Sequence, residues 1–265
     1  MPRAFAAALM VAAIAACRIS LSPLQNRIDV GRETFVVFVG DGEGSQGDLY
    51  AVKADGGSVF PVTYTRLHET MPALSPDGVM LAFLRGRRAG DSTDYRVVVM
   101  NLLNGAERVL LTGEEHRAPV TLGWHPTDPV LYIATTGGVL EASVPPRPLT
   151  VTAAADGALA DSSLSVLLGT PVFARVAPCS TNAGTCVVPR SGTEQLITED
   201  ATDVVRWGGD SLAYVSGTRF IVRPLGGGRS RNLRWVSPPA NVRFPTVFEI
   251  GEAESEGSGS SGGSD

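Results

Sequence analysis

Short apolar runs alternate with turn residues along most of the chain, from residue 33 to residue 248. Runs of this kind, bounded by Gly, Pro, Asn and Asp, are typical of β-strands joined by tight turns. Helical periodicity is scarce, whereas the chain contains 30 Gly and 18 Pro residues. The pattern therefore predicts an all-β fold, and 265 residues are enough to bury the core of one such domain.

The most regular part of this pattern is the stretch from Pro72 to Phe83, with the sequence PALSPDGVMLAF. Pro76 sets φ for the first corner of a type I turn, Asp77 can bond its own backbone, and Gly78 takes the exit position without a Cβ clash. Apolar residues flank the turn on both sides, so the stretch predicts a β-hairpin between buried strands. We interpret the three turn residues as structural.

This stretch resembles the WSPDG…LAF signature of the TolB-like propellers, which consist of WD40-like PD40 repeats, with Leu74 where the family usually has Trp. The same apolar frame returns around Trp124 and around Trp207. The repeats follow one another at about 40 to 50 residues, which is the range expected of propeller blades. The resemblance implies a β-propeller at residues 33–250. It covers only the propeller part of TolB, without the N-terminal α/β domain of that protein.

We expect five four-stranded blades. Residues 241–248 have the inner-strand character that the first blade lacks, and we predict that they close the ring by pairing with residues 35–39. The fourth blade is degenerate, because no SPDG-like turn joins its expected first strands, 163–168 and 172–176. Its two outer strands are expected at residues 186–188 and 194–198.

The first residues have the composition of an export signal. A short basic start precedes an apolar run, residues 4–16, that is too short to span a bilayer comfortably. The run ends Ile14-Ala15-Ala16-Cys17, which resembles a bacterial lipobox. The resemblance implies a lipoprotein signal peptide at 1–16, lipidation of Cys17 and a membrane anchor on the periplasmic side of the bacterial cell envelope. The alternative is an ordinary secretory signal, with Cys17 incidental.

The cysteine count agrees with an exported protein. Lipidation of Cys17 leaves Cys179 and Cys186, which bracket a polar turn between two apolar runs. A disulfide there would staple a hairpin, as expected in an oxidising compartment. A metal pair or two reduced thiols are the alternatives, and zinc is disfavoured because no histidine or second Cys pair lies nearby in the sequence.

Two further segments carry no strand pattern. Residues 17–32 are polar and aperiodic, and we interpret them as a tether. Residues 251–265 consist mainly of Gly, Ser and acidic side chains, which predicts a disordered acidic tail. The formal net charge of −5 does not provide the basic surface that binds nucleic acid, so we expect no nucleic-acid partner.

No catalytic set is recognisable in the sequence. A G-x-S-x-G nucleophile elbow is absent. His68, His116 and His125 are isolated, and His125 occupies the Ser position of the repeated motif, which favours a role in the turn. A metal site made by these histidines at one mouth of the ring is the alternative. Residues 41–48 are interpreted as a Gly-rich turn rather than a calcium loop, because Gln46 stands at the position where a calcium loop has Gly.

These observations favour a binding scaffold, and we expect neither a cofactor nor enzymatic activity. Propellers present loops on two faces of a rigid ring, and their function depends on those loops. We therefore expect a protein partner in the cell envelope, with the chain acting as an accessory subunit of an envelope or membrane complex. The alternative is small-ligand or glycan binding, or an unrecognised enzyme, at the mouth of the central channel.

Overall fold

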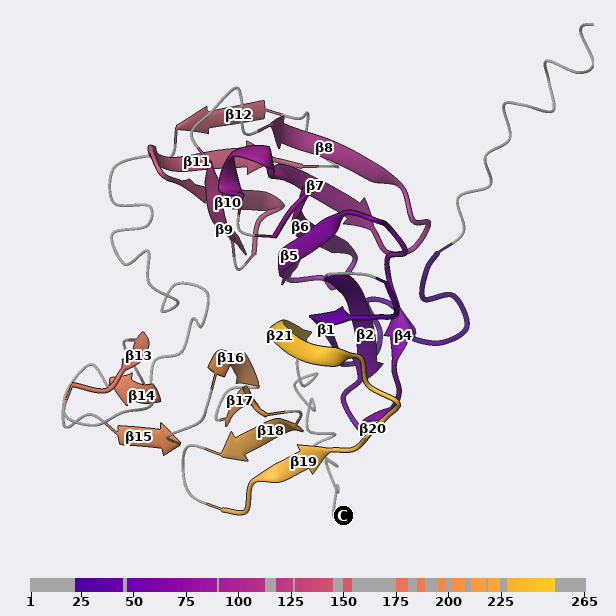
Figure 1. Ribbon diagram of the computed structural model, residues 1–265, viewed down its shortest axis with the longest axis vertical. Coiled ribbons are helices and arrows are strands. Elements are labelled where there is room, and N and C mark those ends of the chain that lie inside the picture. Colours follow the sequence, from indigo (N-terminus) through magenta and orange to yellow (C-terminus); the bar gives the residue numbers. More distant parts are fainter. Residues whose placement is uncertain are drawn as a thin grey trace, which may run out of the picture.

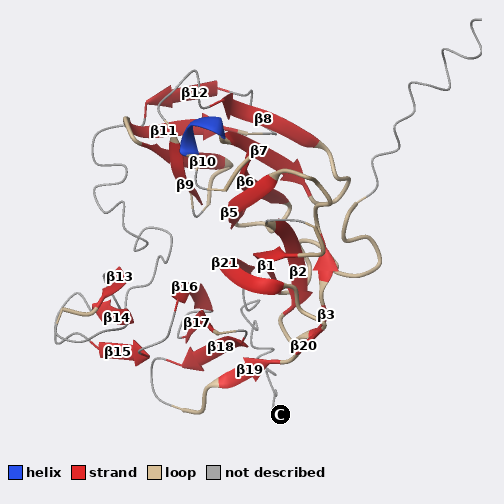
Figure 2. Cartoon of the chain, in the orientation of Figure 1, coloured by secondary structure: helices blue, strands red, loops and turns tan. Residues whose placement is uncertain are grey.

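The computed structural model shows an all-β chain whose sheets stand around a common centre (Figure 1). Strands make up nearly all of its regular structure (Figure 2), and the helix that it describes is the short 3₁₀ helix η1 (Ser92–Asp94). The structure describes residues 22–44, 47–89, 91–112, 118–125, 127–144, 150–153, 175–180, 185–188, 195–198, 202–207, 211–217, 219–224 and 228–250.

Four sheets have four antiparallel strands each, and each is one propeller blade. Blade A consists, from the centre outward, of β21 (Ala240–Phe248), β1 (Phe35–Asp41), β2 (Asp48–Lys53) and β4 (Phe60–Pro61). Blade B consists of β5 (His68–Leu74), β6 (Met80–Gly86), β7 (Arg96–Asn101) and β8 (Glu107–Thr112). Blade C consists of β9 (Pro119–Trp124), β10 (Val130–Thr135), β11 (Gly138–Ser143) and β12 (Thr150–Ala153). Blade E consists of β16 (Thr202–Trp207), β17 (Ser211–Ser216), β18 (Arg219–Pro224) and β19 (Arg231–Leu233).

The propeller prediction is confirmed, but the count of five four-stranded blades is wrong for the residues that the structure describes. Between blades C and E lies a sheet of three strands, β13 (Arg175–Pro178), β14 (Thr185–Val188) and β15 (Gln195–Thr198). The strand expected at 163–168 falls outside the described residues. This part of the sequence lacks the SPDG-like turn that joins the first two strands in blade B.

The predicted closure of the ring is confirmed. β21 pairs antiparallel with β1, with Phe35 opposite Phe248, so the C-terminal strand is the inner strand of the blade that begins the propeller. β21 also contacts the inner strands β5 and β16 of the two neighbouring blades. A second, smaller junction joins the same parts of the chain, where β20 (Trp235–Val236) pairs in parallel with β3 (Gly57–Ser58).

Three of the inner strands carry the same irregularity. The pairing of β5, β16 and β21 with their neighbours shifts register part-way along, and a non-Gly residue with positive φ lies within each shift: Met71, Asp203 and Phe244. A β-bulge of this kind bends a strand and increases its twist. A left-handed conformation at a residue with a Cβ costs about 1–3 kcal/mol, which the surrounding structure must offset. The inner strands of blades A, B and E therefore share one local backbone geometry.

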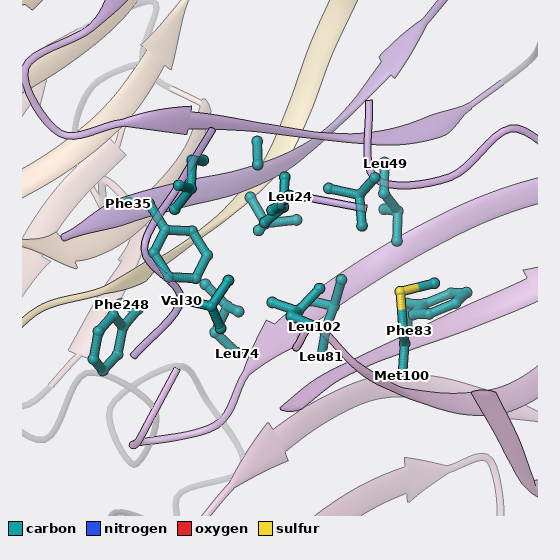
Figure 3. Packing of buried hydrophobic residues seen from close by; sticks show 14 of the residues in the cluster. Leu24, Val30, Phe35, Leu49, Leu74, Leu81, Phe83, Met100, Leu102 and Phe248 are labelled. Atoms are coloured by element: carbon teal, nitrogen blue, oxygen red, sulfur yellow. The ribbon is translucent and has the colours of Figure 1, made fainter. Parts of the chain in front are cut away.

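Hydrophobic side chains fill the spaces between neighbouring blades. The largest of these clusters lies between blades A and B and includes Phe35, Leu49, Leu81 and Phe83 (Figure 3). A second cluster joins blades B and C, and a third joins blades E and A. In the third, Trp235 stacks between two phenylalanines, with ring centroids 4.5 Å from Phe38 and 5.6 Å from Phe220. Burial of one such side chain stabilises the fold by roughly 1.5–3 kcal/mol.

The described part of the segment that we interpreted as a tether does not behave as one. Leu24, Ile28 and Val30 are buried and belong to the core between blades A and B (Figure 3). Their backbone is turned rather than extended, because the N–H groups of Arg27 and Ile28 both donate to the carbonyl of Leu24. Residues 22–34 are therefore a strap packed on the propeller. The sequence did not predict this packing, because the three apolar residues are irregularly spaced and show neither helical nor strand periodicity.

Candidate functional site

The turn that identifies the repeat has a closed set of hydrogen bonds. Ser75 Oγ donates to the Asp77 carboxylate and accepts the N–H of Met80 at 2.8 Å. The Asp77 carboxylate also accepts the N–H of Val79 at 3.0 Å. Gly78 has φ +69°, and a Cβ added there would lie 2.6 Å from the Phe248 ring. Pro76 and Asp77 are exposed, but the carboxylate of Asp77 serves the turn itself. The geometry gives these three residues a structural role.

His125 has the same place in blade C as Ser75 has in blade B. The N–H of Ser75 donates to the carbonyl of Met80 at 2.8 Å, and the N–H of His125 donates to the carbonyl of Val130 at the same distance. The His125 Nδ1 accepts the N–H of Asp128 at 3.1 Å, as a capping group would. Histidine can thus replace serine at this turn because its ring nitrogen accepts backbone N–H groups.

The remaining residues marked by the sequence lie elsewhere. The Sγ atoms of Cys179 and Cys186 are 2.08 Å apart, which is the distance of a disulfide, and their Cα atoms are 5.0 Å apart. The disulfide links the residue that follows β13, Cys179, to Cys186 within β14 of the three-stranded sheet. Cys17 and His116 fall outside the described residues. Among the described residues that the sequence marked, the two cysteines therefore meet as expected, whereas Pro76, Asp77, Gly78 and His125 serve turns of the repeat.

A polar cluster that the sequence did not predict lies at the opposite end of the blades from the Ser75 turn. We call this end the His68 face, where β1 ends and β5 and β21 begin, and the end with the Ser75 turn the Ser75 face. Four residues make up the rim cluster: Asp41, His68, Asn241 and Arg243. The Asp41 carboxylate accepts Arg243 Nη2 at 2.9 Å and Asn241 Nδ2 at 2.8 Å.

Members of the rim cluster pack closely around Gly47, in the space that a side chain at this position would fill. A Cβ at Gly47 would lie 3.1 Å from Arg243 Nη2, 3.2 Å from His68 Cδ2 and 3.0 Å from the carbonyl oxygen of Glu69. Its φ of +126° is also one that side chains disfavour. Behind this point, His68 Nδ1 is hydrogen-bonded to the Tyr95 hydroxyl at 3.0 Å. The imidazole and the guanidinium are thereby held close to each other.

This packing shifts the protonation of two members of the rim cluster. Burial lowers the pKa of His68 below its usual value, and the charge of Arg243 lowers it further, while Asp41 acts in the opposite direction. Burial alone would raise the pKa of Asp41, but the hydrogen bonds from Arg243 and Asn241 hold it below its usual value. The cluster therefore contains a neutral imidazole beside a carboxylate–guanidinium pair at neutral pH.

A buried ion network supports the rim cluster from behind. Glu69 follows His68 in β5, and its side chain is 0% exposed. Its carboxylate accepts the Thr63 hydroxyl and Arg85 Nε, the latter at 2.8 Å, and Arg85 also forms two hydrogen bonds to Glu107. Burial raises the pKa of Glu69, although Thr63 and Arg85 act against this rise. Since Thr63 follows the outer strand of blade A and Glu69 starts blade B, the network fixes the junction of the two blades.

The loop between these blades presents apolar side chains next to the rim cluster. We call residues 62–67 the A–B loop. Tyr64 is 78% exposed and Leu67 is 37% exposed, and both belong to this loop. Thr65 fixes it, because its hydroxyl donates to Glu69 at 3.1 Å and its N–H donates to Asp48 at 3.4 Å. An exposed aromatic ring on an anchored loop beside charged groups is typical of a protein-binding surface.

Within the described residues, His, Cys, Asp and Glu side chains form no group of three placed to hold a metal ion. The same residues include no helix with the length and the apolar character that crossing a bilayer requires.

One solved structure shares this architecture, and others resemble it less closely. TolB from Acinetobacter baumannii superposes with a TM-score of 0.55 at 13% identity, over 82% of this chain and 67% of that one. The chain has a TolB-like β-propeller fold. A putative TolB from Agrobacterium tumefaciens matches at 17% identity, over 77% of this chain and 66% of that one, with a TM-score of 0.33. A nidogen/laminin complex matches at 12% identity, over 80% of each chain, with a TM-score of 0.38. No family model and no curated protein matches the sequence of this TolB-like propeller.

The rim cluster has a weak signature in the sequence of the propeller. Asp41 lies in a Gly-rich turn, His68 lies beyond the apolar part of its strand, and Arg243 lies about 200 residues from Asp41. Only the closure of the ring brings Arg243 to Asp41. The predicted pairing of residues 241–248 with residues 35–39 already implies that Asp41 and Arg243 lie close together. Extending this pairing to the ends of the two strands identifies their contact.

We predict that His68 titrates below the ordinary histidine value of 6.5. A depressed pKa in the folded state means that the unfolded chain binds the proton more readily. The contribution of neutral His68 to stability is therefore full above 6.5 and is lost as the pH falls through its folded pKa. NMR titration of the imidazole measures this, with His68→Gln for assignment. Arg243→Gln should raise the pKa of His68, and titration of His68 at or above 6.5 in the unsubstituted protein would contradict the account.

Proposed function

We propose that the protein is a lipid-anchored scaffold on the periplasmic side of the bacterial cell envelope that binds another protein through the His68 face. The observation that carries the proposal is Tyr64, a highly exposed aromatic side chain on the anchored A–B loop, next to the rim cluster. The lipobox-like sequence that ends in Cys17 supports the anchor. The propeller fold supports the role of a scaffold, because its loops are presented by a rigid body.

The His68 face carries residue types that are common at the centre of protein-binding surfaces. Tyr and Arg are enriched among the residues that dominate binding energies, and they act best when the surrounding contacts exclude water. Tyr64 and Leu67 provide apolar area, while Asp41 and Arg243 form a charged pair on the same face. Because Thr65 already fixes the loop, a partner would not have to order it on binding, which lowers the entropic cost of association.

A second candidate is small-ligand or glycan binding at the same rim cluster. The observation that favours it is His68, whose Nδ1 is hydrogen-bonded to Tyr95 and whose Nε2 has no hydrogen-bond partner within the part of the chain that the structure describes. A neutral imidazole can donate to or accept from a sugar hydroxyl. Binding of purified protein to an array of glycans, lost in His68→Ala, would decide for this candidate.

We expect Tyr64 to lie against the partner in intact cells. A photoreactive phenylalanine in place of Tyr64 keeps the aromatic ring and should give one discrete, higher-mass adduct, which mass spectrometry then identifies. The matched control is the same substitution at Leu103, which is also exposed but lies on the Ser75 face. An absent adduct at position 64, or the same adduct from both positions, would count against the His68 face as the binding surface.

Lipidation has a separate readout. Cells grown with an alkyne analogue of palmitate should incorporate the label into the protein, and Cys17→Ser should abolish it, because the thiol of Cys17 is the atom through which the acyl-bearing lipid is attached. The two remaining cysteines provide the control, since Cys179→Ser with Cys186→Ser should leave labelling unchanged. Label that persists in Cys17→Ser would refute lipidation at this position.

A further inference from the structure

We infer that the lipid anchor holds the Ser75 face of the propeller toward the bilayer, so that the His68 face points away from it. The inference names the membrane-facing surface and rests on the proposed lipidation of Cys17. Three observations lead to it: the short chain from Cys17 to the folded body, the place where that chain joins the body, and the depth of the blades.

The segment between Cys17 and the folded body is short. Ser22 is the first residue that the structure describes, and it lies five residue steps along the chain from Cys17. Five residues span at most about 17 Å even when fully extended. A lipidated cysteine keeps its backbone at the membrane surface, because its acyl chains enter the hydrocarbon region. Ser22 therefore lies within about 17 Å of the lipid headgroups in every orientation of the propeller.

The strap joins the body on the Ser75 face. Ser22 Oγ donates to the carbonyl of Leu102, in the turn between β7 and β8, at 2.6 Å. Leu24 is fully buried behind this contact. Further along the strap, the Cβ position of Gly31 lies 3.2 Å from the carbonyl oxygen of Asp77 in the SPDG turn. The strap is thus fixed to two turns of the same face, and the exit point of the tether cannot slide to the other one.

The depth of the blades then excludes the inverted orientation. β1 runs from the Ser75 face to the His68 face and has seven residues, so it is about 20 Å long. The A–B loop adds to this depth on the His68 face. If that face rested on the bilayer, Ser22 would stand more than about 20 Å above it, beyond the reach of the tether. With Cys17 at the membrane, the Ser75 face can rest on the lipid headgroups, because Ser22 lies on that face.

The Ser75 face also carries side chains suited to the headgroup region. Leu103 is 54% exposed and follows Leu102, beside the exit of the tether. Arg27 and Arg32 are exposed on the strap; the guanidinium of Arg27 lies over the Phe60 ring of β4, 5.3 Å from its centroid, and Arg32 can bind anionic headgroups. The exposed carboxylates Asp29 and Asp77 lie on the same face, so the charge is mixed. The tether, rather than the charge, is what selects this face.

Depth-dependent fluorescence quenching tests the orientation. The full-length lipidated protein is reconstituted in vesicles of phosphatidylethanolamine and phosphatidylglycerol that contain a nitroxide-labelled headgroup lipid. A fluorophore on a non-natural residue, which leaves Cys179 and Cys186 untouched, replaces Leu103, Tyr64 or Val109; the last of these is 48% exposed on the outer strand of blade B. We expect strong loss of fluorescence at 103 and none at 64. Equal or greater loss at 64, or the greatest loss at 109, would overturn the inference.

Two controls separate this outcome from the proposed function. Flotation of the vesicles and palmitate labelling report anchoring alone, so loss of both refutes lipidation. Protein that is anchored but shows no contrast in fluorescence loss between positions 103 and 64 refutes only the orientation. A Gly-Ser insertion of about 12 residues after Arg18 adds about 19 Å of mean reach. It should remove the contrast while flotation persists. A contrast that survives the insertion would overturn the tether as its cause.

Discussion

The pairing of β21 with β1 is the interaction on which the rest of the structure depends. It joins the two ends of the propeller and gives blade A the inner strand that the start of the chain lacks. Neighbouring inner strands are linked through it, since Thr246 Oγ accepts the N–H of Leu74 in blade B at 3.2 Å. The same kind of link continues to blade C, where Trp124 Nε1 donates to the carbonyl of Ala73 at 2.9 Å. Without β21, the inner edge of β1 and the cores on both sides of blade A would face water.

The same strand connects the two faces of the molecule. Its first residues provide Asn241 and Arg243 to the rim cluster, and its last residue, Phe248, packs against Gly78 in the SPDG turn. Just beyond it, the N–H of Ile250 donates to Thr34 Oγ1, next to the strap. The surface that we propose for partner binding and the surface that we place at the membrane are therefore opposite ends of one rigid element.

Much of this fold could be predicted from the sequence because its signals are local. Pro76, Asp77 and Gly78 specify a turn, and apolar runs on both sides specify the strands. The closing strand could also be predicted, because the first blade needs an inner strand and residues 241–248 have its character. The packing of the strap could not, since Leu24, Ile28 and Val30 show no period. The rim cluster was missed because Asp41 and Arg243 meet only after the ring has closed.

Hydrogen exchange of the purified protein tests the closure most directly. If β21 is the inner strand of blade A, its amides should be protected as strongly as those of β1 and β2, because all three then exchange only when the blade opens. Phe248→Ala should weaken the protection of β21 and β1 together, since their rings pack with centroids 5.6 Å apart at Phe35 and Phe248. Rapid exchange along β21 beside a protected β1–β2 pair would contradict the account.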